Sequence, residues 1–226
     1  MYNSLMKLAI LLPGYIDSPD YLHFIVIQKG LQKLGYKVVR LDPCGLWGGG
    51  DASRYSITNY LKDIKDVIDK SKGEDVTEII LVGHSIGGFV SIIAGEKYKE
   101  VSKVIALCPP AEFDNPPIKW DNNGYRISER DLPEDSKKKR VFRIPVSFAY
   151  DSFTYNAAET VKRIEKPLMI LIALEDTIVP PSETEQLVKA AKNPYVVRVE
   201  KMGHDFRFSE EECFIVVEKI EMFLKR

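Results

Sequence analysis

Short apolar runs alternate along the chain with longer amphipathic stretches. Runs of about four to eight apolar and β-branched residues between turn signals are typical of buried strands. The predicted strands are Lys7–Leu12, Lys37–Leu41, Glu78–Val82, Lys103–Leu107, Leu168–Ala173 and Val196–Val199. Most of them are apolar at nearly every position, which indicates a parallel sheet covered by helices on both faces.

The amphipathic stretches between these runs predict helices with apolar residues on one face. The predicted helices are Leu22–Leu34, Ile57–Lys70, Ile86–Tyr98, Ser182–Ala191 and Glu210–Leu224. Ser182 with Glu185 and Ser209 with Glu212 have the spacing of capping boxes. The alternation predicts an α/β fold of about six mostly parallel strands flanked by helices, in a single domain over residues 1–226.

One connection, residues 109–165, is far longer than the few residues that usually join neighbouring elements. Within it we predict a small hairpin (Tyr125–Ile127 with Val141–Ile144) and a helix over about 147–163. A long aromatic-rich segment at the carboxyl end of a strand predicts an inserted lid subdomain over a site. The alternative is a decorative subdomain with its own small core. For the lid we predict four substrate-binding aromatics: Trp120, Tyr125, Phe148 and Phe153.

Net charge, cysteine content and the length of the first apolar stretch exclude several kinds of partner, site and location. The formal net charge is −1, so we expect no nucleic acid and no anionic membrane as partner. The basic run Lys137–Arg140 follows an acidic stretch, and we expect it in a solvated loop. Three scattered cysteines suit neither a disulfide framework nor a zinc site. The apolar stretch Leu8–Leu12 is too short for a signal peptide core or a membrane span, so we expect a cytoplasmic protein.

A serine between glycines follows the third predicted strand. The sequence Gly83-His84-Ser85-Ile86-Gly87 matches G-x-S-x-G, and an amphipathic stretch begins at Ile86. In a strand–turn–helix with this motif, the serine takes a strained backbone and exposes its hydroxyl. We therefore predict that Ser85 is a nucleophile, the alternative being a glycine turn with an idle serine.

A serine hydroxyl needs a base to become nucleophilic, and the chain has three histidines. His84 precedes the serine and should point to the other side of the strand, where we expect it to pack or support the site. His23 lies in the first predicted helix. His204 follows the last predicted strand, at the sheet edge where the serine's strand also ends. We therefore predict His204 as the base.

The base in turn needs a carboxylate that holds its tautomer. The fifth predicted strand ends at Glu175 and Asp176. We predict Asp176 as the acid, with Glu175 and, less favoured, Asp151 in the long connection as alternatives. The chain order Ser85, Asp176, His204 is the one that this strand–turn–helix architecture requires.

The developing oxyanion requires two hydrogen-bond donors. The N–H of Ile86, directly after the serine, is the first. The second is expected from the loop after the first strand, where Gly14 allows close backbone approach and the Tyr15 N–H can face the site. The chain has neither a G-x-G-x-x-G after its first strand nor a P-loop lysine. We expect no nucleotide, metal or other cofactor.

Together these motifs resemble the α/β-hydrolase superfamily over nearly the whole chain, and within it the small feruloyl and cinnamoyl-type serine esterases. The segment LDPCGLWGGGDASRYSITNYLKDIKDVI is similar to their glycine-rich loop and the helix after it. The resemblance implies the α/β-hydrolase fold with a lid, Ser85 as nucleophile, Asp176 as acid and His204 as base. It also implies Tyr15 and Ile86 as oxyanion donors. One departure is Pro13-Gly14, where the family usually has His-Gly.

The predicted activity is hydrolysis of carboxylic esters through an acyl-serine. We expect small to medium apolar or aromatic esters as substrates. A thioesterase, lipase or amidase would use the same three residues, and a ligand-binding protein could keep the fold with little activity. The sequence leaves the oligomeric state open.

Overall fold

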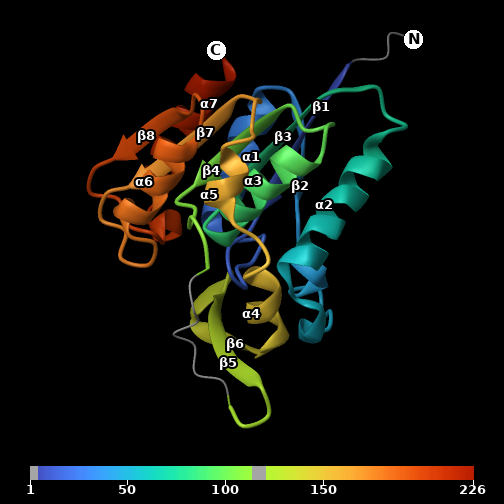
Figure 1. Ribbon diagram of the computed structural model, residues 1–226, viewed down its shortest axis with the longest axis vertical. Coiled ribbons are helices and arrows are strands. Elements are labelled where there is room, and N and C mark those ends of the chain that lie inside the picture. The colour runs from blue at the N-terminus through green and yellow to red at the C-terminus, as the bar shows by residue number, and fades with distance from the viewer. Residues whose placement is uncertain (1–4, 114–120) are drawn as a thin grey trace.

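The computed structural model of the chain describes residues 5–113 and 121–226. Six strands form one sheet in the order β2-β1-β3-β4-β7-β8, and all neighbours are parallel (Figure 1). These strands are β1 (Met6–Leu12), β2 (Tyr36–Arg40), β3 (Val76–His84), β4 (Lys103–Leu107), β7 (Leu168–Ala173) and β8 (Tyr195–Val199). The predicted parallel sheet is confirmed: β4 and β7 have the predicted bounds, and the other four strands differ from theirs by one or two residues.

Seven α-helices, a separate two-stranded ribbon and three short 3₁₀ helices complete the regular elements in the described part of the chain, the last being Pro43–Gly45, Ala52–Arg54 and Phe206–Phe208. The helices are α1 (Leu22–Lys33), α2 (Ile57–Ser71), α3 (Ile86–Lys97), α4 (Ser147–Ser152), α5 (Ala157–Val161), α6 (Pro181–Ala190) and α7 (Glu210–Leu224). The ribbon consists of β5 (Tyr125–Leu132) and β6 (Asp135–Pro145), which pair antiparallel.

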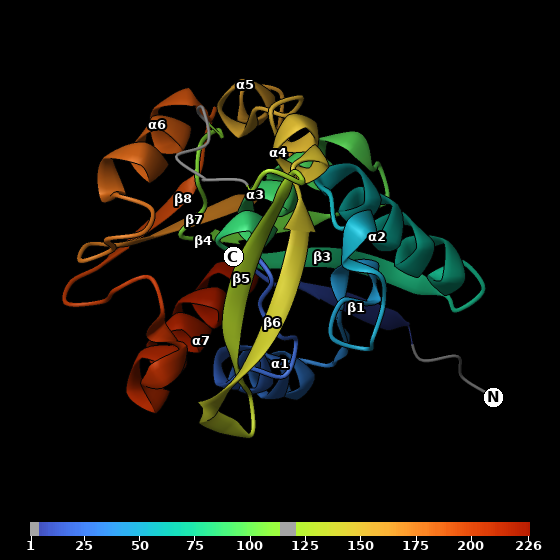
Figure 2. The same ribbon diagram turned by 90° about the horizontal axis from the view of Figure 1, so that it is seen from below.

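The helices cover both faces of the sheet (Figure 2). Helices α1 and α7 lie together on one face, over a core that includes Phe24, Ile105 and Val216. Helices α2, α3, α5 and α6 cover the other face, with Phe89 in the core beneath them. Because the central strands are buried on both sides, their near-continuous apolar sequences follow from this packing.

The two predicted helix caps have different outcomes. Ser209 caps α7, and its hydroxyl accepts a hydrogen bond from the N–H of Glu212 at 3.2 Å. The cap predicted at Ser182 is wrong, because α6 already begins at Pro181. Proline is favoured at the first helical position, where its missing N–H would have had no partner.

Residues 109–165, the insert, depart most from the predicted elements. The hairpin is longer than expected and takes in the basic run Lys137–Arg140, so the prediction of a loop there is wrong. Within the ribbon Asp131 stands opposite Lys139. The basic run thus belongs to strand β6, which the register of the ribbon pairs with β5.

The single helix predicted over 147–163 is divided in two. Helix α4 ends at Ser152, and α5 begins after Asn156, whose side chain accepts a hydrogen bond from the Glu159 N–H at 2.8 Å. Asn156 also forms a β-bridge with Glu112 at the start of the insert. Helix α4 stays beside the hairpin, whereas α5 lies beside α3 in the helix layer (Figure 1).

No helix within the described residues is long and apolar enough to cross a bilayer.

Candidate active site

Ser85 stands at a sharp turn between β3 and α3, with φ 55° and ψ −123°. A non-glycine residue pays a conformational penalty there, and such strain is concentrated at functional sites. The Ser85 N–H donates to the carbonyl of Leu107 in the neighbouring strand β4, at 2.8 Å. The strained turn is therefore fixed to the sheet by its own backbone.

The two outer glycines of the motif allow this turn to form. A Cβ at Gly83 would lie 2.0 Å from the carbonyl oxygen of Gly87. A Cβ at Gly87 would lie 1.9 Å from the carbonyl oxygen of Leu12 on β1. Both obstacles are backbone atoms, which cannot swing aside as a side chain can. The turn thus requires glycine on both sides of Ser85 for steric reasons.

His204 and Asp176 form a buried hydrogen-bonded pair. Nδ1 of His204 lies 2.6 Å from Oδ2 of Asp176, and the carboxylate can only accept, so this nitrogen carries the proton. The other oxygen of Asp176 accepts the backbone N–H groups of Ile178 (2.9 Å) and Val179 (2.8 Å). Burial would raise the pKa of Asp176, but these hydrogen bonds and the His204 ring hold it below its usual value.

The two alternative acids lie elsewhere. Glu175 is exposed beside Asp176, and its N–H donates to the carbonyl of Met202. Asp151 accepts hydrogen bonds from the backbone N–H (3.0 Å) and the hydroxyl (2.5 Å) of Thr58. Of the three carboxylates considered from the sequence, Asp176 is the one paired with His204.

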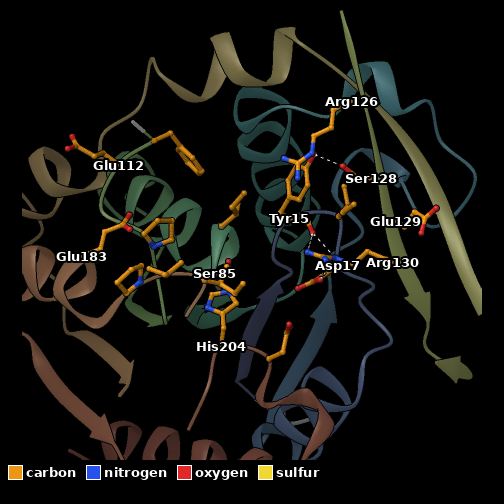
Figure 3. A pocket seen from close by; sticks show the side chains of 18 of the residues that line it. Tyr15, Asp17, Ser85, Glu112, Arg126, Ser128, Glu129, Arg130, Glu183 and His204 are labelled. Atoms are coloured by element: carbon orange, nitrogen blue, oxygen red, sulfur yellow. Dashed lines mark hydrogen bonds and ion pairs between the residues drawn. The ribbon is translucent and has the colours of Figure 1, made fainter. Parts of the chain in front are cut away.

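Ser85 and His204 line one pocket of about 830 Å³. In Figure 3 they lie side by side at its centre, at the carboxyl ends of the parallel strands. His204 comes from the loop after β8 and Asp176 from the loop after β7, so residues far apart in the sequence meet at one edge of the sheet. This is the edge where open α/β sheets place their ligands.

The two predicted oxyanion donors flank the same pocket. Ile86 is the first residue of α3, and its N–H has no acceptor within the helix. Tyr15 lies in the loop after β1, and no acceptor takes its N–H among the described residues. The carbonyl of Pro13 accepts the hydroxyl of Tyr60 at 3.0 Å, so a helix-borne side chain holds this loop where the family usually has histidine.

Charged residues stand on opposite sides of the pocket (Figure 3). Arg126 and Arg130 of β5 lie on one side of Ser85, and Glu112 and Glu183 lie on the other. The ring of Tyr15 also lines the pocket. This lining is more polar than the apolar aromatic wall that the sequence suggested.

The predicted substrate-binding aromatics are not among the described residues that line this pocket. Phe148 is buried and stacks on Tyr55 with ring centroids 5.1 Å apart. The Arg143 guanidinium lies over the ring of Tyr125 at 4.2 Å, and Phe153 is an exposed side chain beyond α4. Trp120 lies outside the described residues.

The other two histidines pack behind His204. His84 is buried, and its Nε2 donates to the carbonyl oxygen of His204 at 3.0 Å. Burial lowers the pKa of His84. His23 is fully buried with its ring centroid 5.2 Å from that of His84. The sequence indicated the supporting role of His84. Within the described residues, no group of three or more His, Cys, Asp or Glu side chains could hold a metal ion.

A buried ion pair joins the insert to the loop that carries His204. Both guanidinium Nη atoms of Arg207 lie 2.8 Å from the two carboxylate oxygens of Asp131 on β5. The Arg207 guanidinium also lies 4.0 Å above the ring of Tyr21, whose hydroxyl donates to the Asp131 carbonyl. No local pattern pointed to this contact, because its partners are 76 residues apart in the chain.

The α/β-hydrolase fold family matches residues 9–132 of the chain. The chain belongs to this family. The human serine hydrolase BPHL is 23% identical to it over 233 aligned residues, which cover 90% of this chain and 75% of that protein. The family predicted from the motifs is therefore confirmed.

Solved structures of α/β hydrolases have the same fold as this chain. The structure of Est1E from Butyrivibrio proteoclasticus with bound ferulic acid has a TM-score of 0.79 at 22% identity, and covers 97% of this chain and 88% of that one. The monoacylglycerol lipase of Paleococcus ferrophilus has a TM-score of 0.72 at 20% identity, and covers 96% and 94%. At this level of identity the likeness establishes the α/β-hydrolase fold.

Proposed function

We propose that this α/β hydrolase cleaves carboxylic esters through an acyl-serine intermediate. The observation that carries the proposal is the buried His204–Asp176 pair, whose histidine lines the same pocket as a serine on a strained turn. Ester-cleaving relatives of the same fold support it, among them the Paleococcus lipase.

The chemistry follows from the protonation state of the pair. His204 carries its proton on Nδ1, so Nε2 has a free lone pair that removes the proton of the Ser85 hydroxyl. The serine oxygen attacks the ester carbonyl, and the carbonyl oxygen becomes an oxyanion held by the N–H groups of Ile86 and Tyr15. His204 then gives its proton to the departing alcohol, and water releases the acid by the same steps in reverse.

The pocket supports small to medium esters as substrates. A volume of about 830 Å³ is within the range of small-molecule sites, about 300–1,000 Å³. Tyr15 and Phe113 offer aromatic surface for an apolar part of the ester, and the arginines and glutamates offer positions for a polar part. We propose residues 109–165 as a lid whose hairpin forms one wall of the pocket.

The test is a Ser85→Ala variant assayed on 4-nitrophenyl acetate. Because Ser85 forms the covalent bond, kcat should fall by about 10⁶, as in other hydrolases of this kind. A fluorophosphonate should modify the wild-type chain at Ser85 and leave Ser85→Ala unmodified, as read by peptide mass. Full activity of the variant, or modification at another residue, would refute the proposal.

A panel of esters, thioesters and amides with matched acyl groups then tests the leaving group. The proposal expects the highest kcat/KM on esters. Faster cleavage of thioesters or amides would instead indicate a thioesterase or an amidase. Absence of any turnover, with Ser85 intact and the chain folded, would favour a ligand-binding role.

A further inference from the structure

A buried carboxylate lies next to the proposed oxyanion site. Asp17 follows Tyr15 by two residues in the loop after β1, is 5% exposed and lines the same pocket as Ser85. A Cβ built on Gly14 would lie 2.7 Å from Oδ2 of Asp17 and 3.2 Å from Cβ of Ser85. The carboxylate and the nucleophile therefore flank the same glycine.

A negative charge at this place opposes ester hydrolysis unless it is compensated. The reaction develops a second negative charge on the carbonyl oxygen, and like charges repel strongly where water is excluded. Burial alone would raise the pKa of Asp17, but the His84 ring and the Arg130 guanidinium lower it to about 2. Asp17 is thus ionised throughout the neutral range.

Arg130 of the insert supplies the compensating charge. Its Nε lies 3.1 Å from Oδ1 of Asp17. Its Nη2 donates to the carbonyl oxygen of Tyr15 at 2.9 Å, 115 residues away in the sequence. A planar guanidinium fits two acceptors at once and loses little freedom in doing so. One side chain therefore holds both the charge and the backbone of the loop after β1 (Figure 3).

The two histidines near Asp17 do not supply the positive charge that Arg130 brings to it. Nδ1 of His84 lies 3.8 Å from Oδ2 of Asp17, beyond hydrogen-bond distance. Burial lowers the pKa of His84 and lowers that of His23 further, and no hydrogen bond joins either ring to Asp17. The Arg130 guanidinium is then the cation in direct contact with Asp17.

We propose that Arg130 is a positioning residue for ester hydrolysis: it neutralises Asp17 and holds the Tyr15 carbonyl, which keeps the loop after β1 in the conformation in which the Tyr15 N–H faces the oxyanion. This inference rests on the proposed function. It makes the insert part of the acyl-transfer machinery, because the hairpin strand β5 carries Arg130.

The test compares Arg130→Gln, Asp17→Asn and the double variant on 4-nitrophenyl acetate, an ester too small to need the insert for binding. Arg130→Gln should lower kcat about 30-fold, which corresponds to about 2 kcal/mol of transition-state stabilisation, with KM within about twofold of wild type. In the double variant the uncompensated charge is gone, so kcat should recover at least fivefold relative to Arg130→Gln.

Two further variants separate positioning from folding. Arg143→Gln, on the other strand of the hairpin and outside the pocket lining, should keep kcat within about twofold and is the matched control. Arg130→Lys keeps the charge but not the planar fork, and its kcat should lie between those of wild type and Arg130→Gln. If Arg130→Gln melts below the assay temperature, Arg130→Met, which also removes the charge but keeps an apolar stem, gives the same comparison with and without Asp17→Asn.

The outcomes distinguish the two proposals. The inference is overturned if Arg130→Gln loses no more kcat than Arg143→Gln, or if Asp17→Asn restores nothing in a folded double variant. The proposed function is refuted by a different result, in which the wild-type chain neither cleaves the ester nor reacts with the fluorophosphonate at Ser85.

Discussion

Replacement of Asp176 by asparagine tests the proposed base and acid through the geometry around one carboxylate. Oδ1 of Asp176 accepts the N–H groups of Ile178 and Val179, whereas Oδ2 faces Nδ1 of His204 at 2.6 Å. Backbone N–H groups can only donate. An asparagine at this position must therefore keep its oxygen toward them and present its NH₂ group to His204.

That orientation reverses the tautomer of the imidazole. Facing an NH₂ donor, Nδ1 of His204 has to accept, so the proton moves to Nε2, the atom that should deprotonate Ser85. In the best-studied enzymes of this kind the same change lowers kcat by about 10⁴, or about 5 kcal/mol of activation free energy. We expect a loss of this size for Asp176→Asn on 4-nitrophenyl acetate, with little change in KM.

The matched control is Glu175→Gln, one residue away and exposed. We expect it to keep kcat within about threefold, because its side chain is not the one paired with His204. Circular dichroism melting curves show whether each variant is folded at the assay temperature. The reasoning is refuted if Asp176→Asn stays within tenfold of wild type, or if Glu175→Gln loses more activity than Asp176→Asn.

Three further predictions concern stability and selectivity. Gly87→Ala should lower the free energy of unfolding by more than about 3 kcal/mol in urea titrations, because its Cβ would lie 1.9 Å from the Leu12 carbonyl oxygen; a loss below 1 kcal/mol would contradict this. The pKa of Asp17 is about 2 in the folded chain against 3.8 ordinarily, so its stabilisation is present above about pH 4 and is lost as the pH falls toward 2. Between pH 5 and pH 2, wild type should therefore lose about 2 kcal/mol more than Asp17→Asn; equal losses would refute the contribution. Arg126 lines the pocket, so Arg126→Met should lower kcat/KM about fivefold for a 4-nitrophenyl ester with a terminal carboxylate, relative to a neutral ester of equal length; an unchanged ratio of the two would argue against this contact.

The sheet and the paired residues of the site were predictable because their signals are local. Each buried strand is a short apolar run, and its carboxyl end places Ser85, Asp176 and His204 at one edge. The glycines around Ser85 carry a steric requirement that a reader of the sequence can recognise.

The insert was less predictable, because tertiary contacts decide its structure. Helix α4 ends at Ser152 and Asn156 caps the next helix, α5, a break that a helical pattern over 147–163 does not reveal. Phe148 was expected to contact substrate, but it fills the space against Tyr55. In the sequence, an aromatic residue that lines a pocket cannot be distinguished from one that packs in a small core.

The charged contacts of the site were missed for a different reason. Asp17 pairs with Arg130 and Asp131 pairs with Arg207, and in each pair the two residues are far apart in the chain. No spacing rule joins residues at such distances. Asp17 itself was an indication. A carboxylate in a loop expected to approach the nucleophile becomes buried, and a buried carboxylate requires a positively charged partner.

The double attachment of the hairpin has a consequence for how such proteins change over time. Strand β5 joins the loop after β1 through Arg130 and the loop after β8 through Arg207 and Asp131. A segment attached in this way cannot be exchanged between proteins independently of the two loops that it contacts. An insert transplanted from a relative would bring its own pocket-lining residues but leave Asp17 without Arg130 and Arg207 without Asp131. Drift in this lineage should therefore alter the hairpin and both loops together, and a laboratory graft should succeed only when all three are moved as one set.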